Sequence, residues 1–198
     1  MSLSMYLKLS LMVLALIPSA YADKIESLLV GLSAVDMAGN PHQFADAIGN
    51  KHSVYVIMAS DCPISRRMTP RLKELADIAS QHDIDFYGVF SDDWSTRDSI
   101  LNYQREYDVD FPLLLDSQTA IADKLRSGVK PEAFVFNKQG ELVYRGRIDN
   151  RFASIGRLRN TFDQHDLLNA ILAVKEGALP EVEKTEPVGC VYKSWPEK

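Results

Sequence analysis

The sequence predicts an α/β fold, a three-layer sandwich in which a central mixed sheet carries helices on both faces. Two observations predict it. Strand-like runs rich in Val, Ile, Phe and Tyr alternate with stretches whose apolar residues recur every three or four positions, as expected of strands joined by covering helices. The last two strand-like runs follow each other across a short turn, which adds an antiparallel edge to the sheet.

In the first half of the fold, strand and helix alternate twice. Residues 53–59 and 84–90 are runs rich in apolar, β-branched and aromatic residues, which is typical of strands. Between them, apolar residues recur at helical spacing from Leu72 to Ala79. Residues 95–107 repeat this helical pattern after the second strand.

The second half adds a short buried strand, a short helix, a hairpin of two strands and a final helix. A glycine follows each helix, so we expect the first to end at Gly128 and the second at Gly177. In order, the expected elements are residues 111–116, 119–126, 133–137 with 142–148, and 164–176.

The composition is that of a globular protein with one domain. The chain has 198 residues, of which 46% are hydrophobic and 25% charged, and this excludes a disordered chain. The formal net charge of −5 argues against nucleic-acid binding, because no basic surplus is present to neutralise phosphates. Two cysteines exclude a four-cysteine zinc site, but they permit one disulfide, or one reactive thiol with its partner.

Residues 1–22 have the pattern of a secretory signal peptide. Lys8 precedes an apolar run over residues 9–17, and Ala20 and Ala22 form an A-x-A cleavage site. The run is about half of the roughly 20 residues that a membrane-spanning helix needs, so we expect no stable membrane insertion after cleavage. An uncleaved N-terminal anchor is the alternative. The protein is thus expected to be periplasmic or secreted, where a cysteine pair persists as a disulfide.

The remaining chain divides into one domain and a tail. The domain spans residues 23–177 and opens with a mixed segment that contains a turn signal at Gly39. Residues 178–198 are polar and proline-containing, and we expect them to form a C-terminal tail that carries Cys190.

The segment that indicates chemistry begins at Cys62, between a strand and a helix. Pro63 suits the first helical position, where its missing N–H costs nothing. A thiolate there faces free backbone N–H groups and the positive end of the helix dipole, a setting that lowers a cysteine pKa from about 8.5 toward roughly 3.5–7.5. We expect Ser65 to donate a hydrogen bond to the sulfur and Arg66 to add positive charge. A small buried cysteine packed beneath the helix is the alternative.

Three features together resemble the thioredoxin superfamily: Cys62 at a strand–helix junction, Pro70 inside the following helical pattern, and Pro131 ahead of a strand. More specifically, the chain is similar to exported redoxin-domain proteins related to the alkyl hydroperoxide reductase/thiol-specific antioxidant family. These carry a D-C-P-I segment, an R-G-R-I-D box (residues 145–149 here) and a C-terminal V-G-C that ends here at Cys190. The resemblance covers about residues 28–192 and implies a thioredoxin-like sandwich.

The resemblance also implies a function. Pro131 would be cis and lie beside Cys62, shaping a groove for an extended substrate; an ordinary trans loop proline is the alternative. Cys62 would attack a protein disulfide or a hydroperoxide, and Cys190 or an external thiol reductant would resolve the product. A thiol oxidoreductase of this kind, peroxidase or disulfide-exchange, needs neither an organic cofactor nor a metal.

The chain departs from its relatives at positions that matter for the reaction. Ser65 replaces the second cysteine of a C-x-x-C motif, so a mixed disulfide cannot be resolved within the motif. Tyr55 and Ala59 replace the Pro and the Thr or Ser of typical peroxiredoxins, which removes the hydroxyl that orients peroxide. Arg66 replaces the second cysteine of the copper-chaperone motif C-x-x-x-C, which disfavours that branch.

Cys190 is then the natural second thiol, and three interpretations are open. It resolves an oxidised Cys62 during a redox cycle, it forms a permanent staple with Cys62, or the two cysteines do not pair. A bridge over so long a loop stabilises the fold by about 4–5 kcal/mol in loop-entropy models.

The rival function is a non-enzymatic module that binds a protein partner or a soft metal such as copper. Met58 and Met68 flank Cys62 and suit Cu(I), although core packing explains Met58 equally well. Arg145 and Arg147 either place a cation near the site or face solvent. The histidines are scattered and expected to be at the surface or satisfied, and two aromatic residues are expected to pack: His42, His52, His82 and His165, and Tyr144 and Trp195.

Overall fold

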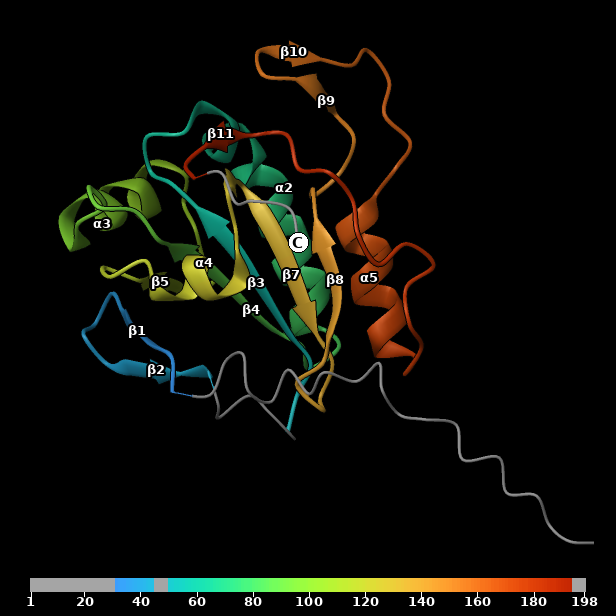
Figure 1. The fold of residues 1–198 in the computed structure, drawn as a ribbon, viewed down its shortest axis with the longest axis horizontal. Coiled ribbons are helices and arrows are strands. Elements are labelled where there is room, and N and C mark those ends of the chain that lie inside the picture. Colours follow the sequence, from blue (N-terminus) through green and yellow to red (C-terminus); the bar gives the residue numbers. More distant parts are fainter. Residues whose placement is uncertain (1–30, 45–49, 194–198) are drawn as a thin grey trace, which may run out of the picture.

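The computed structural model describes residues 31–44 and 50–193, and the predicted signal peptide lies outside them. Its centre is a seven-stranded sheet (Figure 1). The strands are β1 (Ser33–Asp36), β2 (Pro41–Gln43), β3 (Ser53–Met58), β4 (Asp85–Phe90), β5 (Leu113–Leu115), β7 (Glu132–Phe136) and β8 (Leu142–Gly146). Their order across the sheet is β2-β1-β5-β4-β3-β7-β8. The inner strands β3, β4 and β5 are parallel and the outer ones antiparallel, so the predicted mixed sheet is confirmed.

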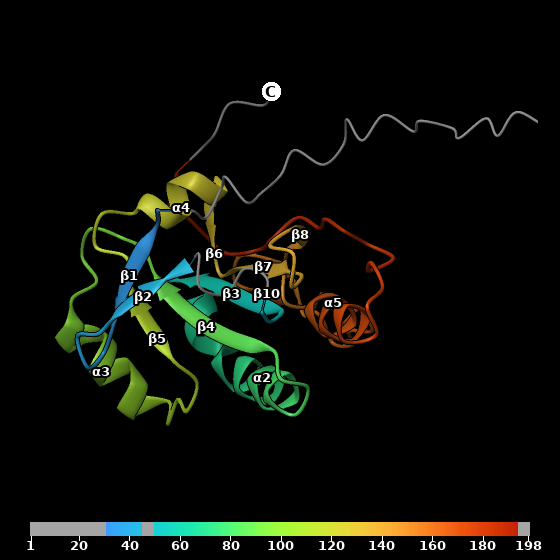
Figure 2. The ribbon, with the colours of Figure 1, turned by 90° about the horizontal axis from the view of Figure 1, so that it is seen from below.

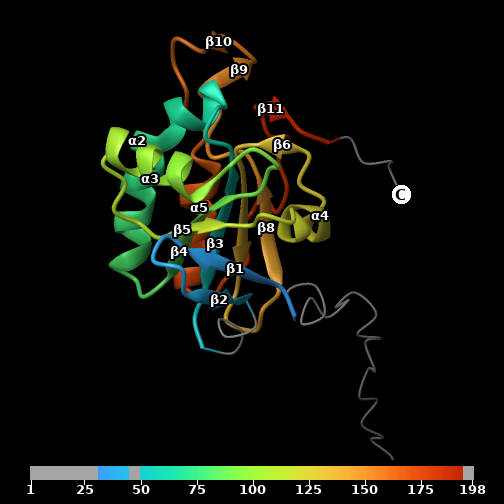
Figure 3. The same cartoon turned by 90° about the vertical axis from the view of Figure 1, so that its left-hand side faces the viewer.

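Helices cover both faces of this sheet, as predicted. The described helices of the sandwich are α2 (Pro63–Ser80), α3 (Arg97–Glu106), α4 (Ala120–Leu125) and α5 (Asp166–Lys175). The side chains of α2, α3 and α5 belong to one core cluster, and those of α4 belong to a second cluster on the opposite face. Figures 2 and 3 show α4 across the sheet from α2 and α3. None of the helices in the described ranges is long and apolar enough to cross a membrane.

Burial on both faces explains why strand β3 is apolar after its first residue, Ser53. All six of its residues are buried. Val54, Val56 and Met58 join the cluster beneath α2 and α5, whereas Tyr55 and Ile57 join the cluster beneath α4. Because successive side chains of a strand point to opposite faces, a strand covered on both faces needs apolar residues at every position.

The second half of the fold differs from the sequence-based prediction at two places. Helix α4 ends at Leu125, and Arg126 adopts the left-handed conformation at φ 52°, so the end predicted at Gly128 is wrong. The turn closes earlier because the Ser127 amide donates to the Ala122 carbonyl at 2.9 Å. The polar loop before α5 contains a small hairpin, β9 (Phe152–Ser154) and β10 (Arg157–Leu158).

The C-terminal tail runs back over the domain. The Arg145 amide of β8 donates to the Glu183 carbonyl at 2.9 Å, and the Thr185 amide donates to the Arg145 carbonyl at 3.1 Å. Farther on, β11 (Cys190–Val191) pairs antiparallel with β6 (Val129–Lys130) in a sheet of two strands, and Figure 3 shows the two side by side.

Candidate functional site

The site forms where β3 ends and α2 begins. Cys62 is the N-cap residue of α2 and has an extended backbone, and Pro63 occupies the first helical turn. The Arg66 amide donates the first helical hydrogen bond to the Cys62 carbonyl at 3.0 Å. The predicted strand–cysteine–helix junction is therefore confirmed, and the sulfur lies at the positive end of an 18-residue helix that continues through Pro70.

Cys62 is joined to Cys190 by a disulfide. The bond connects residues 128 positions apart in sequence, with 6.0 Å between the Cα atoms. Of the interpretations left open by the sequence, unpaired cysteines are contradicted. In this state Cys62 is only 2% exposed and belongs to the main core cluster.

Pro131 lies beside the disulfide. The Lys130–Pro131 peptide bond is cis, so the trans alternative is wrong. The Lys130 carbonyl oxygen is 3.2 Å from the Cys62 sulfur. Lys130 is also the residue of β6 that pairs with Cys190, so one backbone segment contacts both cysteines.

Ser65 and Arg66 position the loop in front of Cys62 rather than the sulfur itself. The Ser65 hydroxyl is fully buried and accepts a hydrogen bond from the Ala59 amide at 3.5 Å. The Arg66 Nε donates to the Ser60 carbonyl at 2.8 Å. Among the described contacts, the hydrogen bond that we expected from Ser65 to the sulfur is not formed in this disulfide state, because that hydroxyl faces the end of β3.

A buried lysine next to the disulfide was missed by the sequence analysis. The Lys130 side chain is 2% exposed, and its Nζ donates to the Ser91 carbonyl and lies 3.8 Å from the Asp92 carboxylate. The Tyr192 ring of the tail covers the ammonium, with 3.8 Å between Nζ and the ring centroid. Burial lowers the pKa of Lys130, and the charge of Asp92 opposes this effect. No local pattern signals this burial, because the groups that enclose the lysine come from distant parts of the chain.

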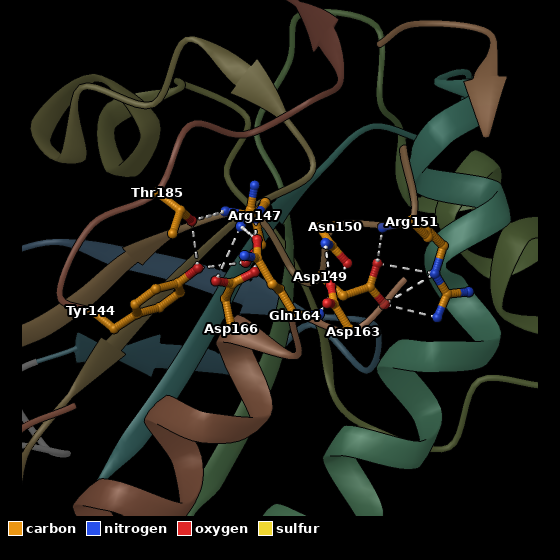
Figure 4. Close-up of polar contacts among 9 residues, drawn as sticks. All are labelled: Tyr144, Arg147, Asp149, Asn150, Arg151, Asp163, Gln164, Asp166 and Thr185. Atoms are coloured by element: carbon orange, nitrogen blue, oxygen red, sulfur yellow. Dashed lines mark hydrogen bonds and ion pairs between the residues drawn. The ribbon is translucent and has the colours of Figure 1, made fainter. Parts of the chain in front are cut away.

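The arginines of the R-G-R-I-D box are paired and do not supply a cation to the sulfur. Arg145 forms an ion pair of 2.6 Å with Glu132, and Arg147 forms one of 2.7 Å with Asp166. Burial raises the pKa of Glu132, against the attraction of Arg145. Asp149, the last residue of the box, accepts the Arg151 amide at 3.0 Å (Figure 4).

The same box holds the tail. The Thr185 hydroxyl accepts a hydrogen bond from the Arg147 amide at 3.0 Å and shares another with the Tyr144 hydroxyl at 2.8 Å (Figure 4). Tyr144 is 1% exposed, so its predicted packing role is confirmed. Trp195 lies outside the described residues.

No metal site is apparent in the part of the chain that the structure describes. No group of three or more His, Cys, Asp or Glu side chains is placed to hold an ion there. Met58 and Met68 are both buried in the main core cluster with Cys62, where packing accounts for them.

Comparisons with known proteins show what this chain is similar to. The profile of the AhpC/TSA family matches residues 26–145. A search of curated proteins finds no significant match. Among solved structures, a hypothetical protein from Sinorhizobium meliloti is 20% identical with a TM-score of 0.71, covering 83% of this chain and 92% of that chain.

Two other structural neighbours are described as redox proteins. A secreted Mycobacterium tuberculosis disulfide oxidoreductase homologous to DsbE is 20% identical with a TM-score of 0.52, covering 59% of this chain and 82% of that one. The M. tuberculosis protein dsbF, solved in mixed oxidised and reduced forms, is 17% identical with a TM-score of 0.59, covering 74% and 97%. At these identities the likeness shows the fold, which is thioredoxin-like.

Proposed function

This chain belongs to the AhpC/TSA family, and we propose that it is an exported thiol–disulfide oxidoreductase that uses Cys62 as nucleophile and Cys190 as resolving thiol. The domain over residues 23–177 supplies Cys62, and the tail over residues 178–198 supplies Cys190. One observation carries the proposal: Cys190 meets Cys62 as part of a strand paired with β6. A cysteine presented by an extended segment of polypeptide is thus within bonding distance of a sulfur at a helix N-terminus.

The reaction starts from the reduced protein. The Cys62 thiolate, stabilised by the free N–H groups of α2, attacks one sulfur of a partner disulfide. A bond forms between Cys62 and that sulfur, the partner disulfide breaks, and the second partner sulfur leaves as a thiolate. The Cys190 thiolate then attacks the Cys62 sulfur, which forms the Cys62–Cys190 disulfide and releases the first partner sulfur as a thiolate. An external dithiol reductant restores both thiols.

Disulfide exchange is favoured over peroxide reduction by the residues around the sulfur. Ala59 stands where typical peroxiredoxins carry a hydroxyl, and it is buried. The hydroxyl of Ser65 faces the Ala59 amide, and that of Thr69 donates to the Ser65 carbonyl at 3.0 Å. These side chains support the backbone of the junction, and they leave hydrogen peroxide without the hydroxyl that orients it in the family.

Export is supported by the signal pattern of residues 1–22 and by the disulfide. A disulfide of this kind persists in an oxidising compartment such as the periplasm or the extracellular space. We therefore place the protein there, acting on thiol or disulfide groups of proteins. N-terminal sequencing of the protein from the periplasm or medium should begin at Asp23. Recovery of the full chain from a membrane fraction would contradict export by cleavage.

The activity is tested with the wild type and the variants Cys62→Ser and Cys190→Ser. Each is reduced, freed of reductant, and mixed with oxidised glutathione or with hydrogen peroxide, and the products are followed by mass spectrometry. We expect glutathione disulfide to give the Cys62–Cys190 disulfide in the wild type. Cys190→Ser should stop at a glutathione adduct on Cys62, and the reaction at this site should be lost in Cys62→Ser.

Two outcomes would contradict the proposal. If Cys62 in the Cys190→Ser variant stays inert to glutathione disulfide while the protein is folded, the disulfide is a structural staple. If hydrogen peroxide oxidises the wild type much faster than glutathione disulfide does, the protein is a peroxidase instead.

A further inference from the structure

We infer that residues 188–193 of the tail are an internal copy of the peptide that this protein recognises in its partners. Resting on the proposed function, this inference defines the substrate class: an extended segment with glycine directly before the reacting cysteine and an aromatic residue two positions after it. Each position of this tail segment meets a different part of the domain.

The position before the cysteine accepts only glycine. A Cβ atom on Gly189 would lie 2.1 Å from the Lys130 carbonyl oxygen and 2.6 Å from its carbonyl carbon. These are backbone atoms next to Pro131, in the segment that also contacts the Cys62 sulfur, so they cannot move aside without moving the site. Val188, one residue earlier, packs against the main core.

The position after the cysteine is unconstrained, whereas the next one is tightly held. Val191 is 71% exposed. Tyr192 donates its amide to the Gly128 carbonyl at 2.8 Å and places its ring over the Lys130 ammonium. The Trp94 ring packs against the Tyr192 ring edge to face, with 6.0 Å between the ring centroids. A cation enclosed in the protein attracts an aromatic face more strongly than an exposed one, so this position selects an aromatic side chain.

The next residue adds a weaker preference for a basic side chain. The Lys193 Nζ lies 3.1 Å from the Asp123 carboxylate. Both side chains are well exposed, so this ion pair contributes little. The tail therefore reads, from Val188 onward, as apolar, Gly, Cys, any residue, aromatic, basic. A partner segment of this pattern forms the same pairing with β6 once reduction has freed the tail.

The test uses the full-length Cys190→Ser variant, in which Cys62 is the sole cysteine. Its substrate is the peptide EPVGCVYK, residues 186–193, with the cysteine linked by a disulfide to thionitrobenzoate. The Cys62 thiolate attacks the peptide sulfur, a Cys62–peptide disulfide forms, and thionitrobenzoate leaves as a coloured thiolate. Parallel peptides carry Gly189→Ala, Tyr192→Ala or, as the matched control, Val191→Ser. Each rate is divided by that of the same peptide with glutathione.

We expect the parent peptide and the Val191→Ser control to react alike. The Tyr192→Ala peptide should react about fivefold more slowly, because it loses the contact with the Lys130 cation, and Gly189→Ala should be slower still. In a protein that also carries Lys130→Met, the difference between the Tyr192→Ala and parent peptides should shrink, because the two groups act as a pair. The protein's own tail competes equally with every peptide, so the ratios are unaffected by it.

The outcomes separate this inference from the proposed function. If Cys62 reacts with the symmetric disulfide of thionitrobenzoate but reacts with the four peptides at equal relative rates, the inferred recognition pattern is wrong and the oxidoreductase function stands. A reaction with the small disulfide and none with any peptide has the same meaning. If Cys62 is inert to the small disulfide as well, the proposed function fails. Cys190→Ala serves as a second background in the event that Cys190→Ser does not fold.

Discussion

Gly146 lies so close to Thr185 that a Cβ atom on the glycine would stand 2.2 Å from the threonine Oγ1 and 2.4 Å from its carbonyl oxygen. Gly146 also has a φ of 144°, which L side chains rarely adopt. The glycine of the R-G-R-I-D box thus leaves space for the tail to cross β8 on its way to Cys62. The R-G-R-I-D box thus positions the tail that carries the C-terminal V-G-C segment.

Gly146→Ala should displace the tail. We expect the free energy of unfolding to fall by about 2 kcal/mol or more, and oxidation of reduced protein to the Cys62–Cys190 disulfide to slow. Urea unfolding and the rate of disulfide formation with oxidised glutathione measure the two effects. Gly156→Ala is the matched control, because Gly156 has a φ of 74° but nothing within 4 Å of an added Cβ. If Gly156→Ala slows oxidation as much as Gly146→Ala, backbone strain and not a blocked tail is responsible.

Reduction of the disulfide should free only the end of the tail. The Tyr192 amide bonds to Gly128, next to the disulfide, whereas Thr185 holds the Arg147 amide without any help from the cysteines. We expect hydrogen exchange at the Tyr192 amide to rise about tenfold or more on reduction, with Arg147 unchanged. Thr185→Val should raise hydrogen exchange at the Arg147 amide in both redox states, because the acceptor of that amide is lost. Equal loss of protection at both amides on reduction would show that the tail detaches as one unit.

Glu132 should make the stability depend on pH in a defined direction. Burial raises the pKa of Glu132 in the folded protein above the ordinary 4.5. At a pH between the unfolded and the folded pKa, the folded protein therefore binds more protons than the unfolded chain. The contribution of Glu132 to the free energy of unfolding therefore falls as the pH rises. Glu132→Gln removes this part of the pH dependence of the unfolding free energy.

The unfolding free energy of Glu132→Gln, relative to wild type, should thus increase as the pH rises above about 4.5. Chemical denaturation of the oxidised proteins at several pH values measures the difference. Glu141→Gln, at an exposed position of the β7–β8 hairpin, controls for the loss of a carboxylate. A relative stability that decreases with pH would mean that the attraction of Arg145 outweighs burial.

A small thiol should attack the oxidised protein at Cys190. Cys62 is 2% exposed, whereas Cys190 is half-buried. A sulfur at a helix N-terminus is also the better leaving thiolate. After a brief reaction with reduced glutathione and an acid quench, peptide mapping should find the adduct on Cys190 and a free thiol on Cys62. An adduct that forms first on Cys62 would show that the tail opens before attack.

Elements that depend on neighbouring residues were determined by the sequence alone. The apolar run that forms β3, the helical spacing from Leu72 to Ala79 and the junction at Cys62 all appear in the structure as predicted. Each follows from local periodicity or from one terminus signal, since the side chains that face the core repeat with the period of the strand or helix. The cis bond at Pro131 was implied only by the family resemblance.

The tertiary structure decided how distant segments meet. The sequence left open whether Cys62 and Cys190 pair, and whether the arginines of the R-G-R-I-D box serve the site or face solvent. Their disulfide spans 128 positions, and the burial of Lys130 depends on Tyr192 in the tail and on the loop that carries Asp92. Such contacts have no local period, because they arise only after the sheet and helices have packed and brought these segments together.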